Sequence, residues 1–260
     1  MTLIGWIIAF SLVGGVLSVL AAASFLLIPE SWRSRLLPAM VSFAIGALLG
    51  AAFLAVLPHA LESPGLRDMH AITGTVLGGL LGFFLLEKLV LWRHCHADEC
   101  ETHAPDRRHS HTSAAGYLIV IGDGVHNFVD GVLIAAAFYT DIHLGVVTAL
   151  AVAAHEIPQE VGDFAILLHS GFTRGKAFFY NMLSSLTTVI GGVLAYFFLG
   201  LAQSAVPYVL AVAASSFIYI AVADLIPGLH KRVDPRATFE QVMLIACGIT
   251  VIALAHAALH

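Results

Sequence analysis

Apolar segments long enough to cross a lipid bilayer recur along almost the whole of this 260-residue chain. A bilayer core of about 30 Å requires about 20 helical residues, and a window of this length predicts eight spans. Charged residues make up only 11% of the chain, against roughly 25% in soluble domains. The sequence therefore predicts an all-α polytopic membrane protein that forms a single domain over residues 1–260. The predicted spans cover about residues 3–27, 38–60, 70–92, 114–140, 143–169, 176–200, 205–227 and 239–258.

The basic residues lie almost entirely on one side of this arrangement. Eleven of the 12 Lys and Arg residues fall in the odd-numbered loops, and Arg67 alone falls in an even-numbered loop. Because short cytoplasmic loops are enriched in Lys and Arg, the odd loops are predicted to be cytoplasmic and both termini extracytoplasmic. The net charge of −5 mostly reflects acidic residues inside apolar segments, so it indicates no nucleic-acid partner.

Residues 94–113 differ from the rest of the chain in composition. This segment is polar, has no apolar period and contains five histidines and two cysteines. We expect it to be a disordered cytoplasmic loop between the third and fourth spans. Its imidazole and thiolate groups suit loose zinc binding, and the alternative is a solvated linker. Direct participation in a site within the spans is not expected.

Two short polar runs interrupt the fourth and fifth spans, DGVHNFVDG at 123–131 and HEIPQEVGD at 155–163. In the fourth span the polar side chains have the spacing i, i+3, i+4 and i+7, which places them on one helix face. In the fifth span they form a wider polar face. The nine side chains able to bind a metal ion or a proton are Asp123, His126, Asn127, Asp130, His155, Glu156, Gln159, Glu160 and Asp163.

The two polar faces are predicted to meet near the middle of the bilayer. His126 and Glu156 each lie about 20 Å along their helix from the short turn near residues 140–143. An isolated charge at the bilayer centre costs roughly 2.5–3.5 kcal/mol, so such a set must neutralise itself, face water or hold a cation. The alternative is a hydrogen-bonded network that holds helices together, although such a network does not need so many acids.

The ligand set combines imidazole, carboxylate and amide groups. It suits zinc, iron(II), manganese or cadmium better than calcium, which prefers oxygen ligands alone. The set contains no thiolate, and a site without soft sulfur binds a borderline cation less tightly, as suits an ion that must leave again. Pro158 would free the carbonyl of Ala154, which could act as a ligand or mark a kink.

At these residues the chain resembles the ZIP (Zrt- and Irt-like) metal transporters. HNFVDG at 126–131 matches the family's fourth-helix signature, and HEIP at 155–158 matches its fifth-helix signature. The resemblance is greatest to the subfamily whose fifth helix reads HEIPHE and continues with GDFAILL, as residues 162–168 do here. LPHA at 57–60 resembles the end of that subfamily's second helix.

The resemblance implies a transporter that carries a divalent cation into the cytoplasm, with no prosthetic group. The cation would be zinc first, with cadmium, iron or manganese as the other candidates. It also implies a 3+2+3 bundle, in which spans 1–3 and 6–8 form an inverted repeat around spans 4 and 5. The sequence shows this repeat faintly, because LPH at 57–59 and IP at 226–227 end the second and seventh spans alike.

Carried over position by position, the resemblance implies two neighbouring metal sites. The first would use His126, His155 and Gln159, and the second would use Asn127, Asp130, Glu156 and Gln159. Position 159 departs from the family pattern, which has histidine there in the most similar subfamily and often glutamate elsewhere. The neutral glutamine bears on which metal is preferred and on whether two ions bind together.

A second tier of residues is expected along the pathway. Glu160, Asp163 and Asp224 would line the inner exit, with Asp123 beside the central site. His59 would lie at the outer entrance or serve as a structural hydrogen-bonding residue. Because histidine binds metal in its neutral form, uptake should weaken as the pH falls through about 6.5. The compact loops favour a bacterial plasma membrane, and the 23 glycines favour close helix contacts, including a homodimer face.

Three other classes of protein compete with this interpretation. A membrane metalloprotease would use HExxH, but Gln159 replaces the second histidine and Pro158 distorts the turn. A cation diffusion facilitator exporter would have six spans and a cytoplasmic carboxy-terminal domain, whereas this chain ends just after its last span. A metal sensor would require an output domain, and the sequence offers none.

Overall fold

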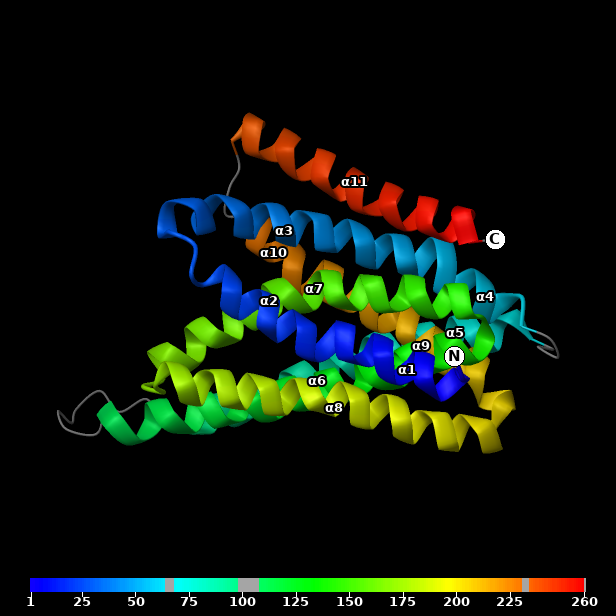
Figure 1. Cartoon of the computed structure of the whole chain (residues 1–260), viewed down its shortest axis with the longest axis horizontal. Helices are drawn as coiled ribbons and strands as arrows, with labels where there is room; N and C mark the ends of the chain where they lie inside the picture. The colour runs from blue at the N-terminus through cyan, green and yellow to red at the C-terminus, as the bar shows by residue number, and fades with distance from the viewer. Residues whose placement is uncertain (64–67, 98–107, 231–233, 260) are drawn as a thin grey trace.

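Helices make up nearly all of the chain that the computed structural model describes, which is residues 1–63, 68–97, 108–230 and 234–259. These residues contain no β-strand. The long helices lie roughly along one common direction and form a bundle (Figure 1). The prediction of an all-α polytopic membrane protein is therefore confirmed.

Each predicted span corresponds to one helix or to consecutive helical segments. The first span comprises α1 (Leu3–Leu12), the π-helical turn η1 (Val13–Leu17) and α2 (Ser18–Phe25). The second comprises α3 (Glu30–Gly50), the π-helical turn η2 (Ala51–Val56) and α4 (Leu57–Leu61). The seventh comprises η3 (Gln203–Ala205), α9 (Val206–Tyr219), the π-helical turn η4 (Ile220–Leu225) and α10 (Ile226–Leu229). The other spans are α5 (Met69–Ala97), α6 (Arg108–Thr140), α7 (Ile142–His169), α8 (Arg174–Leu201) and α11 (Pro235–Leu259).

Seven spans among the described residues are long and apolar enough to cross a membrane, and α7 is the one outside this group. At 28 residues α7 has the required length, but its polar run lowers its hydropathy. The two ends of the chain lie at the same end of the bundle (Figure 1). Termini on the same side require an even number of crossings. Counting α7, the fifth along the chain, as a span raises the total from seven to eight and meets this requirement.

Three helix boundaries lie clearly outside the predicted spans. The second span begins at Glu30, before the predicted start at residue 38, because Pro38 is accommodated inside α3. The segment 94–113, predicted to be a loop, is helical as far as Ala97 and again from Arg108. The cost of helix formation lies in nucleation, so a helix formed in the bilayer extends cheaply into polar sequence. The remainder of that segment, 98–107, lies outside the described residues.

The helix α7 occupies the centre of the bundle (Figure 1) and packs against α1, α2, α3, α6, α8 and α11. Polar side chains at membrane depth are tolerated where protein surrounds them instead of lipid. The most extensive contact of the bundle joins α6 to α8. Glycines bring these two backbones together, since a Cβ added at Gly131 would lie 1.9 Å from the carbonyl oxygen of Thr188.

The second and seventh spans are built alike. In each, a π-helical turn, η2 or η4, directly precedes a short helix that begins with a proline-containing pair, at Pro58 and Pro227. Proline lacks an amide donor and frees the carbonyl four residues earlier, and a widened turn accommodates that change. The turn η2 packs on α9, and η4 packs on α3. This correspondence supports the inverted repeat, which stays a prediction.

Candidate metal site

The tight connection between α6 and α7 sets the two polar faces against each other. Asp141 alone separates the helices, and it serves as the N-cap of α7. Its Oδ1 accepts hydrogen bonds from the backbone amides of His143, at 2.7 Å, and Leu144, at 3.2 Å. A one-residue connection makes α6 and α7 antiparallel neighbours that pack along their lengths.

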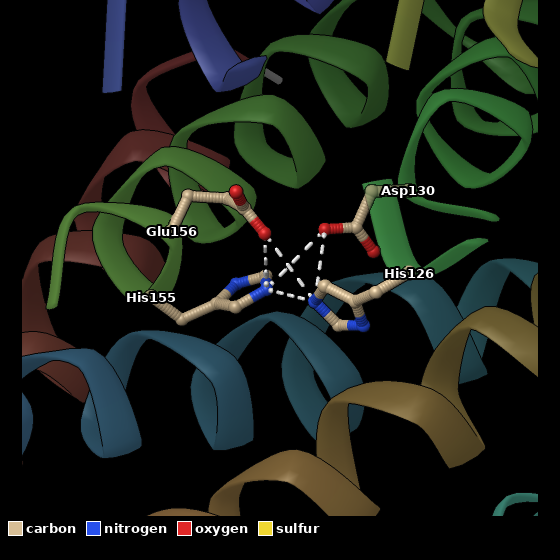
Figure 2. A group of neighbouring side chains, drawn as sticks. All are labelled: His126, Asp130, His155 and Glu156. Carbon is tan, nitrogen blue, oxygen red and sulfur yellow. Dashed lines mark hydrogen bonds and ion pairs between the residues drawn. The ribbon is translucent and has the colours of Figure 1, made fainter. Parts of the chain in front are cut away.

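Four side chains from these two helices point toward one another (Figure 2). His126 and Asp130 come from α6, and His155 and Glu156 come from α7. The His126 Nε2 atom lies 3.3 Å from Glu156 Oε1 and 3.7 Å from Asp130 Oδ2. The His155 Nε2 atom lies 3.3 Å from Asp130 Oδ2, 3.6 Å from Glu156 Oε1 and 3.2 Å from His126 Nε2. We call these four residues the four-ligand group.

The spacing of the four-ligand group matches a tetrahedral metal site. Ligands at about 2.0–2.1 Å from a zinc ion at the centre of a tetrahedron lie about 3.3–3.4 Å from one another. Five of the six distances between the four atoms fall between 3.2 and 3.7 Å, and all four atoms lie within 4.8 Å of one another. The group can therefore hold a divalent cation with little rearrangement.

The hydrogen bonding of His155 prepares its ring for a cation. Its Nδ1 lies 3.1 Å from the backbone oxygen of Ala151, which can only accept a hydrogen bond. In the neutral ring the proton therefore belongs on Nδ1, and the Nε2 that faces the cluster carries a lone pair. A hydrogen bond that fixes the tautomer in this way is typical of metal-binding histidines.

The two carboxylates of the four-ligand group lie at ion-pair distances from the histidine rings, 3.3–3.7 Å from the Nε2 atoms. Asp130 and Glu156 are both fully buried. Within the described part of the chain, no oxygen of either carboxylate has a hydrogen-bond partner. Two buried carboxylates side by side are costly, and a divalent cation bound between them and the imidazoles would neutralise both. A purely structural network would be expected to satisfy these oxygens with donors.

A second group, made of acidic side chains alone, adjoins the four-ligand group. Asp123 of α6 and Glu156 and Glu160 of α7 each place one carboxylate oxygen within 4.8 Å of the others. All three residues are buried. Glu156 therefore belongs to both groups, and the two groups form one continuous polar centre between α6 and α7.

Asn127 and Gln159 lie beside this centre, and the structure does not place them in the four-ligand group. The Asn127 Oδ1 accepts a hydrogen bond from the Thr188 hydroxyl at 2.7 Å, and its Nδ2 donates to Asp123 Oδ1 at 2.9 Å. The Gln159 Nε2 donates to Asp123 Oδ1 at 3.5 Å. Both amides thus surround Asp123, and their direct role as metal ligands stays a prediction.

The remaining predicted residues lie apart from both groups. Asp163 is half-buried further along α7, and Asp224 occupies an exposed position in η4. His59 lies in α4, where its Nδ1 approaches the backbone oxygen of Ala55 to 2.8 Å. Its ring packs against that of His256, with 5.4 Å between the ring centroids.

Two residues of α8 that the sequence did not single out contact the centre. The Ser184 hydroxyl donates to Asp123 Oδ2, and the Thr188 hydroxyl donates to Asn127. The available signal was the hydroxyl-rich run 184–188 inside an apolar span. Hydroxyls in a helix often bond to carbonyls of their own helix, so this run alone does not indicate a contact between helices.

The fold and site together define the class, a polytopic membrane protein with a buried cluster of His, Asp and Glu side chains that could hold a metal ion. The family model described as ZIP Zinc transporter matches residues 2–115 and 93–256. The chain belongs to this ZIP zinc transporter family. The finer assignment to the HEIPHE subfamily stays a prediction.

Individual relatives agree with the family. Zinc transporter ZIP13 of Danio rerio is 32% identical over 266 residues, which cover 83% of this chain and 74% of the relative. Zinc transporter ZIP13 of Homo sapiens is 31% identical over 273 residues, covering 86% and 71%. The protein of the same name from Pongo abelii is 34% identical over 232 residues, covering 83% and 65%. The expectation of a metal transporter instead of an enzyme is confirmed.

Proposed function

We propose that this protein carries a divalent cation, zinc first, across the membrane through the four-ligand group between α6 and α7. The observation that carries the proposal is the convergence of two imidazole nitrogens and two carboxylate oxygens on one buried point. The names of the relatives support zinc as the substrate. The same mixture of nitrogen and oxygen ligands also admits cadmium, iron(II) and manganese.

The proposed direction is from outside to the cytoplasm. The excess of Lys and Arg in the odd-numbered loops supports a cytoplasmic location for those loops and an outer location for the termini. On this orientation His59 lies near the outer end of the second span, and Asp224 lies near the inner end of the seventh. The ion would pass from the entrance at His59 to the four-ligand group and leave past Glu160, Asp163 and Asp224.

Asn127 and Gln159 would contribute when the ion moves. Their side chains are now held by hydrogen bonds to Asp123 and Thr188. The Asn127 oxygen could join the ligand set by exchanging its hydrogen bond from Thr188 for a bond to the cation, and the Gln159 oxygen could do so by a rotation of its amide group. The proposed setting is a bacterial plasma membrane, on the strength of the compact loops, and the chain could pair as a homodimer through its glycine-rich helix faces.

Zinc uptake into proteoliposomes tests the proposal. The native chain is compared with His155→Ala and Glu156→Ala, which each remove one member of the four-ligand group. His169→Ala is the matched control, because His169 is an exposed histidine at the end of the same helix. We expect uptake by the native chain and the control, and its loss in the other two variants. Undiminished uptake by both His155→Ala and Glu156→Ala would refute a pathway through this site.

A further inference from the structure

We propose that Asp123, Glu156 and Glu160 form a second divalent-cation site, built from carboxylate oxygens alone and adjoining the four-ligand group. The inference deepens the proposed function and rests on it, because the two sites share Glu156. The ligand class is a cation that accepts an all-oxygen environment, with Mn²⁺ as a suitable probe.

The state of Glu160 indicates a missing positive partner. Glu160 is fully buried, and neither of its carboxylate oxygens has a hydrogen-bond partner among the described residues. One of these oxygens lies in the same group of atoms as oxygens of Asp123 and Glu156, all within 4.8 Å of one another. Three carboxylates this close together in a buried place repel one another when ionised, and a cation at their centre would relieve that repulsion.

Asp123 is held in position as an acceptor. Its Oδ2 receives the Ser184 hydroxyl, and its Oδ1 receives the amide groups of Asn127 and Gln159. A carboxylate surrounded by donors in this way is oriented by its neighbours. Asp123 thus supplies a preorganised oxygen, while Glu160 supplies an unengaged one.

The same contacts argue against placing the second ion at Asn127 and Gln159, where the family resemblance implies it. The Asn127 oxygen already accepts the Thr188 hydroxyl at 2.7 Å, and the Gln159 amide is turned toward Asp123. Glu160, one position further along α7, has no such engagement. In this chain the oxygens open to a second cation therefore lie on the Asp123 and Glu160 side of Glu156.

The shared residue links the two sites chemically. Glu156 has two carboxylate oxygens, so it can bind one cation with each, or stay attached to a single ion that moves between the groups. An ion leaving the two histidines would keep one ligand while gaining Asp123 and Glu160. The change from nitrogen and oxygen ligands to oxygen alone lowers the affinity for a borderline cation such as zinc, which favours onward release.

Mn²⁺ binding to the purified full chain in lipid nanodiscs tests the second site. Equilibrium dialysis gives the number of bound ions, and pulsed electron paramagnetic resonance detects ¹⁴N coupling from imidazole ligands. We expect two ions in the native chain and one, with nitrogen coupling, in Glu160→Gln. The double variant His126→Ala/His155→Ala should keep one ion without nitrogen coupling. Glu240→Gln, which alters an exposed acid of α11, is the control and should keep both.

The outcomes separate the two proposals. Two ions in Glu160→Gln, or no nitrogen-free ion in the double histidine variant, would overturn the second site while leaving uptake through the four-ligand group intact. Uptake that persists in the double histidine variant would instead overturn the proposed pathway. The single nitrogen-coupled ion expected in Glu160→Gln also reports that this variant folds. Asp123→Asn provides the same measurement if Glu160→Gln is not obtained in folded form.

Discussion

The Nε2 atoms of His126 and His155 lie 3.2 Å apart, although the two residues are 29 positions apart in the chain and belong to different helices. The hydrogen bond from His155 Nδ1 to Ala151 leaves a lone pair on the Nε2 of that ring. A metal ion placed between the two rings could therefore bind this lone pair. With carboxylate oxygens of Asp130 and Glu156 on either side, this place is suited to a divalent cation.

Neutralising a carboxylate of the four-ligand group should weaken metal binding without lowering the stability of the metal-free protein. Glu156→Gln and Asp130→Asn keep the side-chain shape but remove one of two adjacent buried charges, and burial of a charge costs several kcal/mol. In the presence of a chelator we expect the thermal unfolding temperature of both variants to be unchanged or raised. Zinc affinity, measured by calorimetry, should fall by at least about tenfold. Lower unfolding temperatures without metal would show that these acids have satisfied partners in the native fold.

Lower pH should weaken metal binding. A cation binds the neutral imidazoles of His126 and His155 and the ionised carboxylates of Asp130 and Glu156, and protons compete for all four groups. Affinity therefore decreases as the pH is lowered. Zinc binding and vesicle uptake measured at pH 7.5 and pH 5, without a pH gradient, check this expectation. Equal values at both pH values would contradict histidine ligation.

Removing the Thr188 hydroxyl should loosen the polar centre without touching a metal ligand of the four-ligand group. Thr188→Val leaves the buried Asn127 Oδ1 without its donor, and an unsatisfied buried acceptor costs about 1–3 kcal/mol. We expect a lower free energy of unfolding and weaker zinc binding. The control is Thr250→Val, because the Thr250 hydroxyl bonds only to Ala246 of its own helix. Similar losses in both variants would assign the effect to the threonine side chain in general.

The contact between α6 and α8 should tolerate no added methyl group at Gly131. Its Cβ would lie 1.9 Å from the Thr188 carbonyl oxygen, so Gly131→Ala must push the helices apart. Such overpacking costs about 1–3 kcal/mol. Gly122→Ala in the same helix meets nothing within 4 Å and should raise stability by up to about 1 kcal/mol. Thermal unfolding of the two variants compares them directly, and equal stability would contradict the close approach.

The polar residues of the central site were accessible from the sequence because helix geometry is regular. The spacing of Asp123, His126 and Asp130 along α6 is enough to place them on one face. The short turn at Asp141 then requires α7 to pack beside α6, which brings His155 and Glu156 to the same level. The helices α6 and α7 are consecutive in the chain, so their relative placement follows from the short turn between them. The four-ligand group therefore follows from local patterns.

The contacts of α8 could not be predicted in the same way. Ser184 and Thr188 lie 61 positions from the residues that they bond, and nothing in their spacing names a partner helix. Their effect is large, because they decide that Asn127 and Asp123 are held in hydrogen bonds while Glu160 is not. The family resemblance implied which residues could bind a metal ion. Only the packing of the helices shows which of their atoms are already engaged in other hydrogen bonds.

By itself, the sequence determined the spans, the polar faces of two of them and the kind of ion that mixed imidazole and carboxylate groups attract. These properties depend on composition and on the fixed rise and period of a helix, which neighbouring elements hardly change. Only the tertiary structure decided which side chains share a point in space and which are satisfied by another helix. Those contacts depend on how helices from separate parts of the chain pack. A hydrogen bond needs its donor and acceptor within a range of a few tenths of an ångström, and helical spacing alone does not fix that distance between two helices.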